Sequence, residues 1–533
     1  MGKVQDTVNR ISRRHRHNAV PAIALTVPTQ QLSTKDSFPT SYHEVAAMLV
    51  EQTSASYPEQ LIGLTRALKQ CNRVANTATE RLKIVTLFRS QINAVLPTLR
   101  QQFINADVPY NDTAALALKC SSTLLQELAY GYKIALVDVL LRRSGLHRLD
   151  RAHAIYYAMR YLGECALLCS QSYRRWPQQY WRDINTLYWL AEQEHSAGDT
   201  IGAAATEDTA MPPTIARLYA TLAMLFLSDN HQLSALQFEQ LTAELAQHSS
   251  LSEPQKLPAD PLAPTTYSVA INAAAAPAPH RYCNYASTDQ VRFIDLAAIS
   301  TALLQPQASH PQATLSVRQR RNITTRWGQL QPRRLGRKVS DEKMVACTGL
   351  TDCHALLMQP QQHPGIVNKK KTWQLINRSQ QGLCLRGQRR IGPQLRIGQL
   401  IVSRDHQCSE PEIYIGVIRW INNQPKAQTA FGIELLGVGG KAVFSEKQSD
   451  YPKSWQPTLP ALLLEPDNTD NGYTIILNDS NYQCGYRITV SAVDHSAVEP
   501  TDMLITFEVT QAIDYNTGFD CFRLTPVTTG QTV

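Results

Sequence analysis

The chain has 533 residues, of which 43% are apolar, so it is long enough for two to four globular domains with substantial cores. Its formal net charge is +8 at pH 7, which favours an anionic partner such as a phosphate-bearing ligand, a nucleic acid or a membrane surface. No stretch approaches the roughly 20 apolar residues of a membrane span, and no apolar core follows the basic N-terminus, so the sequence predicts a soluble, intracellular protein.

The first half of the chain divides into a polar leader and a helical region. Residues 1–42 are polar, with scattered proline, serine and threonine, which predicts a disordered leader. From 43 to 248, apolar residues recur at intervals of three and four, as in Trp181, Ile184 and Tyr188. Because no sequence repeat is found, this pattern predicts an irregular α-helical bundle rather than a repeat array.

The middle of the chain changes character twice. Residues 249–265 are rich in proline and predict a linker. A connecting α/β segment follows at 266–330, with a strand expected at 267–271, a helix at 291–304 and a basic helix or coil at its end.

Beyond residue 330 the sequence indicates β-structure. Short runs rich in β-branched and aromatic residues alternate with glycine, asparagine and proline, and the segment 441–533 continues in this style. Closely spaced strands without long intervening helices are typical of barrels or meanders. The clearest runs are 373–376, 400–402, 413–421, 431–436, 473–477, 486–490 and 504–509.

A basic stretch precedes the first β-run. Eight basic residues and no acidic residue fall between Arg318 and Lys338. Within it, Arg333 and Arg337 are four residues apart, with Arg334 beside them. Guanidinium groups placed this way can clamp a doubly anionic, planar ligand, because they pair with phosphate oxygens and stack on or donate to a base. A solvated basic linker is the alternative interpretation.

A second candidate motif follows an expected strand. Asn377, Ser379 and Gly382 are spaced as N-x-S-x-x-G between the runs 373–376 and 383–385. Asparagine and serine supply short donors and acceptors at a strand end, and glycine permits a positive φ or a close approach of the backbone to a ligand. An ordinary hairpin turn would have the same composition.

The order of these features resembles that of PilZ domains, the bacterial receptors for cyclic di-GMP. An RxxxR pair precedes N-x-S-x-x-G, then a G-V-I-R-W strand ends at Trp420, and a G-I-E-L strand begins at Gly432. The resemblance covers about residues 330–440 and implies a six-stranded antiparallel barrel over 331–440. It also implies ligand-binding roles: phosphate and guanine contacts for Arg333 and Arg337, added charge for Arg334, hydrogen bonds from Asn377 and Ser379, and an open turn at Gly382.

The wider architecture is similar to that of FimW-type PilZ proteins. A long helical region containing Trp176, Pro177 and Trp181 precedes the barrel, and a β-rich segment follows it. The fold expected is thus a multidomain α+β chain. The resemblance implies a cytoplasmic effector in type IV pilus and surface-attachment control, recruited to the cell pole. Because the charge and the motifs lie after the linker, while the helices before it carry apolar faces, the helical half is expected to bind a protein partner.

Two points remain open in the sequence. Forty residues separate Arg337 from Asn377, more than in a plain PilZ domain, and 349–357 is expected to form an inserted helix in which His354 has a packing or capping role. The insertion leaves open whether arginines between Arg318 and Arg326 clamp the ligand instead.

Other classes of function fit less well. Nucleic-acid binding would suit the basic stretch, but the strands lack a paired aromatic platform. No P-loop, GxSxG, HExxH or dinucleotide-binding fingerprint is found, and the eleven cysteines form no Cys-x-x-Cys pair, so neither an enzyme nor a metal site is expected. No cofactor is expected beyond the ligand. A degenerate PilZ scaffold that no longer binds ligand is a further alternative.

Overall fold

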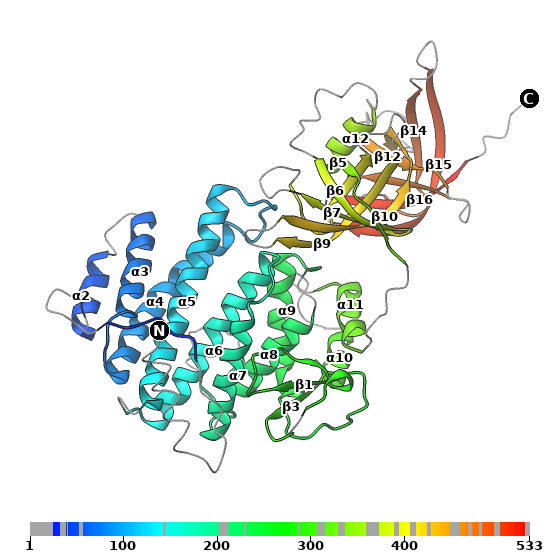
Figure 1. Ribbon diagram of the computed structural model, residues 1–533. Coiled ribbons are helices and arrows are strands. Elements are labelled where there is room, and N and C mark those ends of the chain that lie inside the picture. Colours follow the sequence, from blue (N-terminus) through cyan, green and yellow to red (C-terminus); the bar gives the residue numbers. More distant parts are fainter. Residues whose placement is uncertain are drawn as a thin grey trace, which may run out of the picture. The chain divides into compact units, whose positions relative to one another are not determined.

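The computed structural model divides the chain into two units. One unit comprises Met1–Ala106 and Tyr110–Pro332, and the other comprises Asp107–Pro109 and Arg333–Val533 (Figure 1). The residues that the structure describes are 25–31, 39, 41–52, 57–141, 145–201, 212–228, 231–285, 288–305, 315–328, 336–358, 372–387, 394–405, 412–423, 428–447, 459–466, 472–478, 482–494, 501–516 and 518–527.

The first unit is built on an α-helical bundle, as the sequence predicts. Its helices are α2 (Tyr42–Gln52), α3 (Tyr57–Cys71), α4 (Ala78–Gln101), α5 (Asp112–Leu140), α6 (Arg148–Gln171), α7 (Gln178–Gln193), α8 (Ile215–Leu227) and α9 (Ala235–His248). Several begin at a side chain that accepts a hydrogen bond from the first turn, such as Thr77 before α4 and Asn111 before α5. No helix in the described ranges is long and apolar enough to cross a membrane.

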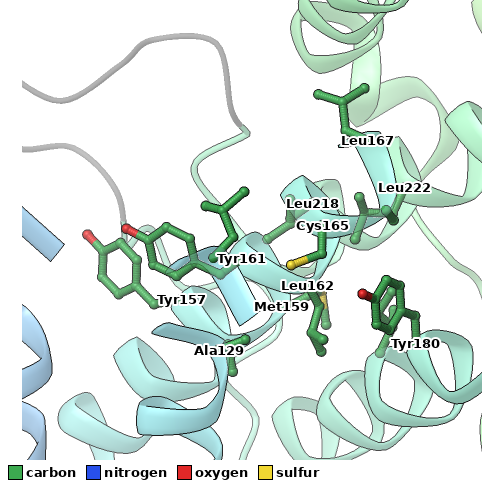
Figure 2. Close-up of a cluster of buried hydrophobic side chains, with 14 of the residues drawn as sticks. Ala129, Tyr157, Met159, Tyr161, Leu162, Cys165, Leu167, Tyr180, Leu218 and Leu222 are labelled. Carbon is green, nitrogen blue, oxygen red and sulfur yellow. The ribbon is translucent and has the colours of Figure 1, made fainter. Parts of the chain in front are cut away.

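Helix α6 is the centre of the bundle. It is buried on nearly all sides, and Figure 2 shows its Tyr157, Met159, Tyr161 and Cys165 among side chains from other helices. A helix that is buried around its whole circumference lies in a core rather than at a surface, and the two buried charges of α6, Arg160 and Glu164, pair with each other. The aromatic residues of this region therefore pack the core, in agreement with the sequence analysis.

A buried ion pair joins α5 to α7. Lys133 Nζ lies 2.7 Å from Asp183 Oδ2, and the two side chains are 0% and 1% exposed. Burial lowers the pKa of Lys133, and the neighbouring Asp183 carboxylate opposes that shift. Because both charged groups are removed from water, loss of either one would leave the other as an uncompensated buried charge.

Part of the expected leader is ordered. Residues 25–31 form an extended segment, which we call the strap, while residues 1–24 and 32–38 lie outside the described residues. The backbone N–H and the hydroxyl of Thr26 both donate to Asp183 Oδ1, at 3.1 Å each. Gln31 forms a parallel bridge with Val74. The prediction of disorder fails here because these polar contacts, invisible in the composition, hold the segment.

The rest of the first unit combines a small sheet with two helices. After η1 (Ser249–Ser252) come β1 (Thr266–Ala270), β2 (Ala278–Pro279), η2 (His280–Tyr282), β3 (Val291–Asp295), α10 (Ala297–Leu304) and α11 (Val317–Gly328), and the sheet has the antiparallel order β2-β1-β3.

The strand expected at 267–271 is confirmed by β1, but the helix expected at 291–304 is wrong at its start. Residues 291–295 pair with β1 as β3, and the helix begins only after Asp295, whose carboxylate accepts a hydrogen bond from Ala297 N at 2.9 Å. The sequence pattern is ambiguous here, and pairing with β1 decides it.

The second unit begins with a closed barrel of six antiparallel strands, which confirms the predicted fold class. The elements are β4 (Lys338–Val339), β5 (Lys343–Thr348), α12 (Leu350–Met358), β6 (Thr372–Ser379), β7 (Gly382–Gly387), β8 (Leu400–Asp405), β9 (Ile413–Asn423) and β10 (Thr429–Val438). The ring runs β6-β5-β8-β9-β10-β7 and closes through the β6–β7 pairing, while β4 is added to β6.

The inserted helix expected at 349–357 is present as α12, and His354 has the expected packing role. Its Nε2 lies 3.0 Å from the carbonyl oxygen of Val443, and its ring packs edge-on against Phe444. Burial lowers the pKa of His354, although the bond to Val443 opposes the shift.

The β-rich C-terminal segment is a second closed barrel. Its strands are β11 (Lys441–Lys447), β12 (Leu459–Leu464), β13 (Tyr473–Leu477), β14 (Arg487–Asp494), β15 (Thr501–Asn516) and β16 (Phe519–Pro526), in the order β11-β12-β13-β16-β15-β14. A shared hydrophobic cluster joins the barrels: Val402 and Ile415 from the first pack with Leu462, Ile476 and Cys521 from the second.

The buried ion pair generates a testable prediction. Lys133→Met should lower the free energy of unfolding by about 3–5 kcal/mol, because it leaves the Asp183 carboxylate buried without its cation. Urea unfolding followed by the far-ultraviolet circular dichroism of the helices measures this loss. Lys119→Met, at an exposed position of α5, is the matched control and should change stability by less than about 0.5 kcal/mol. Equal losses in the two variants would contradict the assigned role.

Candidate ligand-binding site on the first barrel

Strand β6 carries the polar motif and pairs with the end of the basic stretch. On one edge it pairs with β7, and on the other it pairs first with β5 and then with β4. Lys338 lies opposite Arg378, and Val339 lies opposite Asn377. The end of the basic stretch is thus hydrogen-bonded to the strand that carries the polar motif.

Arg337 directly precedes β4 and is exposed. Continued by one residue, the β4–β6 register places Arg337 opposite Ser379. Its guanidinium also acts on the Cys384 thiol of β7: burial raises the pKa of Cys384, and the charges of Arg337 and Arg386 oppose that rise. The structure therefore places this arginine beside the β6–β7 hairpin.

Asn377, Ser379 and Gly382 lie on that hairpin, as the sequence predicts. Asn377 and Ser379 are half-buried, Ser379 pairs with Gly382, and the Ser379 hydroxyl donates to the Gly382 carbonyl at 3.3 Å. The glycine is needed for another reason than a positive φ. A Cβ at Gly382 would lie 2.6 Å from the backbone oxygen of Ile433 on β10, so the close approach of that strand excludes a side chain.

A row of paired residues crosses the outer face of the barrel. Directly paired residues of antiparallel strands project from the same face of a sheet. The adjacent row, which contains Leu375, Leu385 and Phe431, is fully buried and fills the interior, so the first row faces outward. In order along β4, β6, β7, β10 and β9, the outward row is Val339, Asn377, Cys384, Gly432 and Trp420.

Trp420 is a candidate site residue to which the sequence analysis assigns no role. Its half-buried indole lies against Gly432, where a Cβ would be only 1.8 Å from the indole Nε1. Glycine at this position makes room for the ring to lie over β10. The sequence contains both partners, Trp420 in the G-V-I-R-W strand and Gly432 in the G-I-E-L strand. Only the strand register shows that these two residues face each other.

Arg378, between the two polar motif residues, projects to the other face of β6. Its Nη1 donates to the hydroxyl oxygen of Tyr414 at 3.2 Å, and that hydroxyl donates to Glu412. Burial raises the pKa of Tyr414 to about 12, and the Glu412 carboxylate adds to the shift. Arg378 thus ties β6 to the start of β9, which fixes the strand on which Asn377 and Ser379 lie.

The structure describes only some of the other arginines that the sequence offers as ligand-binding residues. Arg333 and Arg334 lie outside the described residues. Arg320, one of the alternative clamp residues on α11, is 6% exposed and pairs with Glu244 through two hydrogen bonds of 2.8 and 3.1 Å. Arg326 donates to Gln232. Both side chains are therefore engaged within the first unit, whereas Asn377 and Ser379 lie in the second.

The outer face of the β4–β6–β7–β10 region thus combines three kinds of group. Arg337 and the exposed Arg386 supply positive charge, Asn377 supplies an amide that both donates and accepts, and Trp420 supplies a flat ring. This set is suited to a ligand that carries phosphates together with a planar base.

Comparison with protein-family models gives two matches in chain order. Residues 43–259 match the N-terminal domain of the cyclic-di-GMP receptor FimW, and residues 358–441 match its middle PilZ domain. The second match contains the Asn377 hairpin and Trp420, and the two together cover more than half of the chain. The chain belongs to the FimW family of PilZ-domain proteins.

A curated relative carries the same description. This chain is 28% identical to the cyclic-di-GMP receptor FimW of Pseudomonas aeruginosa over 179 residues, which are 33% of this chain and 29% of the relative. The match therefore spans less than a third of that protein. No solved structure matches the chain significantly.

The hairpin geometry generates a testable prediction. Gly382→Ala should destabilise the barrel by about 1–3 kcal/mol, because the added methyl group would press on the Ile433 carbonyl. Thermal unfolding followed by the β-structure signal of circular dichroism measures the change. Gly336→Ala is the control, since a Cβ there meets nothing within 4 Å and its φ is not positive. If both variants melt alike, the close approach of β10 does not constrain the hairpin.

Proposed function

We propose that this chain is a cyclic di-GMP receptor, rather than an enzyme, that binds the dinucleotide on the outer face of its first barrel. The observation that carries the proposal is the pairing of β4 with β6, which sets the end of the basic stretch beside the polar hairpin. Membership of a family whose models are described as a cyclic-di-GMP receptor supports it. The proposed binding residues are Arg333, Arg334, Arg337, Asn377, Ser379 and Gly382.

The chemistry of the ligand matches the groups on this face. Cyclic di-GMP carries two phosphate charges and two guanines. Guanidinium groups pair with phosphate through charge-assisted hydrogen bonds, and the Asn377 amide matches the mixed donor and acceptor edge of guanine. We add Trp420 as a stacking surface, because its half-buried indole lies in the same outward row as Asn377.

We further propose that ligand binding controls a protein partner of the helical unit. The segment 329–335, which contains Arg333 and Arg334, connects α11 to β4 and therefore joins the two units. We propose that a bound ligand has a different affinity for different arrangements of this connection, which is the condition for shifting a conformational equilibrium. The partner would belong to the type IV pilus or surface-attachment machinery, reached from the cytoplasm at the cell pole.

The receptor proposal predicts a measurable affinity. Titration calorimetry of the full chain with cyclic di-GMP should give a dissociation constant at or below about 10 μM, equivalent to about 7 kcal/mol of binding free energy. GMP and the linear dinucleotide should bind far more weakly. Arg337→Ala should weaken cyclic di-GMP binding at least about tenfold, because it removes charge-assisted hydrogen bonds.

The matched control for this variant is Arg487→Ala, which removes an exposed arginine from the second barrel and should leave the affinity unchanged. An absence of binding at high micromolar ligand would overturn the receptor function. Normal binding by Arg337→Ala would leave the function standing but move the clamp to other arginines.

Hydrogen exchange with and without the ligand tests the link to a partner surface. Ligand should slow exchange across 318–338 and 373–387, because bound ligand would stabilise both segments against local opening. Exchange should also change on part of the helical surface between 43 and 248. A change confined to the barrel would contradict the control of a partner through the helices while leaving ligand binding intact.

A further inference from the structure

The strap, residues 25–31, crosses the helical bundle of the first unit as an extended chain (Figure 1). It has no regular secondary structure of its own apart from the bridge at Gln31. Each end of the strap is held by hydrogen bonds to residues far away in the sequence. The surface beneath it therefore has the character of a receptor for an extended peptide.

The first end is a recognition site for a hydroxyl group. The Thr26 hydroxyl donates to Asp183 Oδ1 at 3.1 Å and accepts from Arg182 Nη2 at 2.8 Å. The Thr26 backbone N–H donates to the same Asp183 oxygen at 3.1 Å. A hydroxyl can donate and accept at once, whereas an apolar side chain does neither and a carboxylate would face Asp183 with like charge.

The Asp183 carboxylate is held in place by the bundle itself. Its other oxygen, Oδ2, accepts from the fully buried Lys133 at 2.7 Å. Oδ1 therefore has a fixed orientation that does not depend on the strap. An acceptor that is fixed in advance loses little entropy when a peptide binds to it.

The second end recognises the backbone of the strap. Gln31 N–H donates to the carbonyl of Arg73 at 2.7 Å, and Ala75 N–H donates to the carbonyl of Gln31 at 2.9 Å. The Arg73 side chain is itself fixed by two bonds of 2.7 and 2.8 Å to Glu127 on α5. This end accepts any extended chain, as an open strand edge does.

The strap is held by apolar contacts as well as by hydrogen bonds. Leu25 is buried, Val27 and Pro28 are half-buried, and Thr29 and Gln31 are exposed. The hydrogen bonds give modest net stabilisation, because the same groups bond to water when the strap is released, and the burial of Leu25 adds an apolar contribution. The covalent connection to the bundle compensates, since a tethered segment has an effective concentration on the order of millimolar.

We propose that the surface formed by the α3–α4 turn, α5 and the start of α7 is a peptide-binding site, and that the strap is its resident occupant. The ligand class is an extended segment with a threonine or serine at the position of Thr26, an apolar residue before it and free backbone groups five residues later. A partner protein that presents such a segment binds by displacing the strap. This site is separate from the barrel and does not depend on the proposed receptor function.

Exchange of the strap can be measured on the full chain. A fluorescently labelled peptide with the sequence of residues 22–34 is added, and its anisotropy is followed. Thr26→Val in the chain removes the hydroxyl bonds of the resident strap and leaves the receptor surface unchanged. The labelled peptide should therefore bind this variant at least about tenfold more tightly than the wild-type chain.

Thr29→Val is the matched control, because it makes the same chemical change at an exposed position of the strap. The peptide should bind this variant as it binds the wild type. A labelled peptide with valine in place of its own Thr26 should bind none of the chains measurably. Gln31→Pro, which removes the N–H donor to Arg73, is a second way to loosen the strap and should act as Thr26→Val does.

Three results would overturn the proposal. One is that the peptide fails to bind Thr26→Val and Gln31→Pro at protein concentrations up to about 1 mM, the range of tethered effective concentrations. Another is equal binding to Thr26→Val and Thr29→Val. The third is equal binding of the threonine and valine peptides, since recognition of the hydroxyl would then be absent.

Discussion

The candidate site depends on the way in which β6 is shared between its neighbours. A strand has two edges, and β7 occupies one of them along the hairpin. On the other edge, β5 pairs only with residues 372–374, which leaves the second half of β6 to pair with β4. Hydrogen bonds from Ser340 N to Ile376 O and from Leu375 N to Glu342 O continue the contact between these two pairings. Backbone pairing thereby holds the end of the basic stretch, at Lys338, beside the polar hairpin.

The outward groups of the site are supported from within the barrel. Glycine at 382 and 432 gives room to a neighbouring backbone and to an indole ring, respectively. Arg378 anchors the same strand on its other face through Tyr414. Rigid support of this kind reduces the entropy lost when a ligand is bound, so residues that never touch a ligand influence its affinity.

The parts of the structure that the sequence predicts are those set by local pattern. The hairpin around Asn377, the strands of both barrels and the helices of the bundle each follow from hydrophobic period and turn residues. What the sequence does not predict depends on distant partners. Arg320 belongs to a basic run, yet its burial is decided by Glu244, 76 residues away. The place of Trp420 in the same outward row as Asn377 requires the register of four strands with irregularities between them.

The strap and the start of β3 follow the same rule. Composition indicates disorder before residue 42, and contacts with distant residues order the strap, such as that of Thr26 with Asp183, 157 residues away. Residues 291–295 lie before a genuine helix, and their pairing with β1 makes them a strand. In both places the local signal is weak, and a tertiary contact decides the outcome.

The apolar cluster shared by the two barrels has a consequence for how this protein can be divided. The PilZ match ends at residue 441, yet Val402 and Ile415 of the matched barrel are covered by Leu462 and Ile476 of the second. A chain that ended with the matched segment would expose the Val402 and Ile415 side chains to water. The segment that matches the family model and the part of the chain that shares one apolar cluster therefore differ, and any transfer of the first barrel to another protein has to include the second barrel.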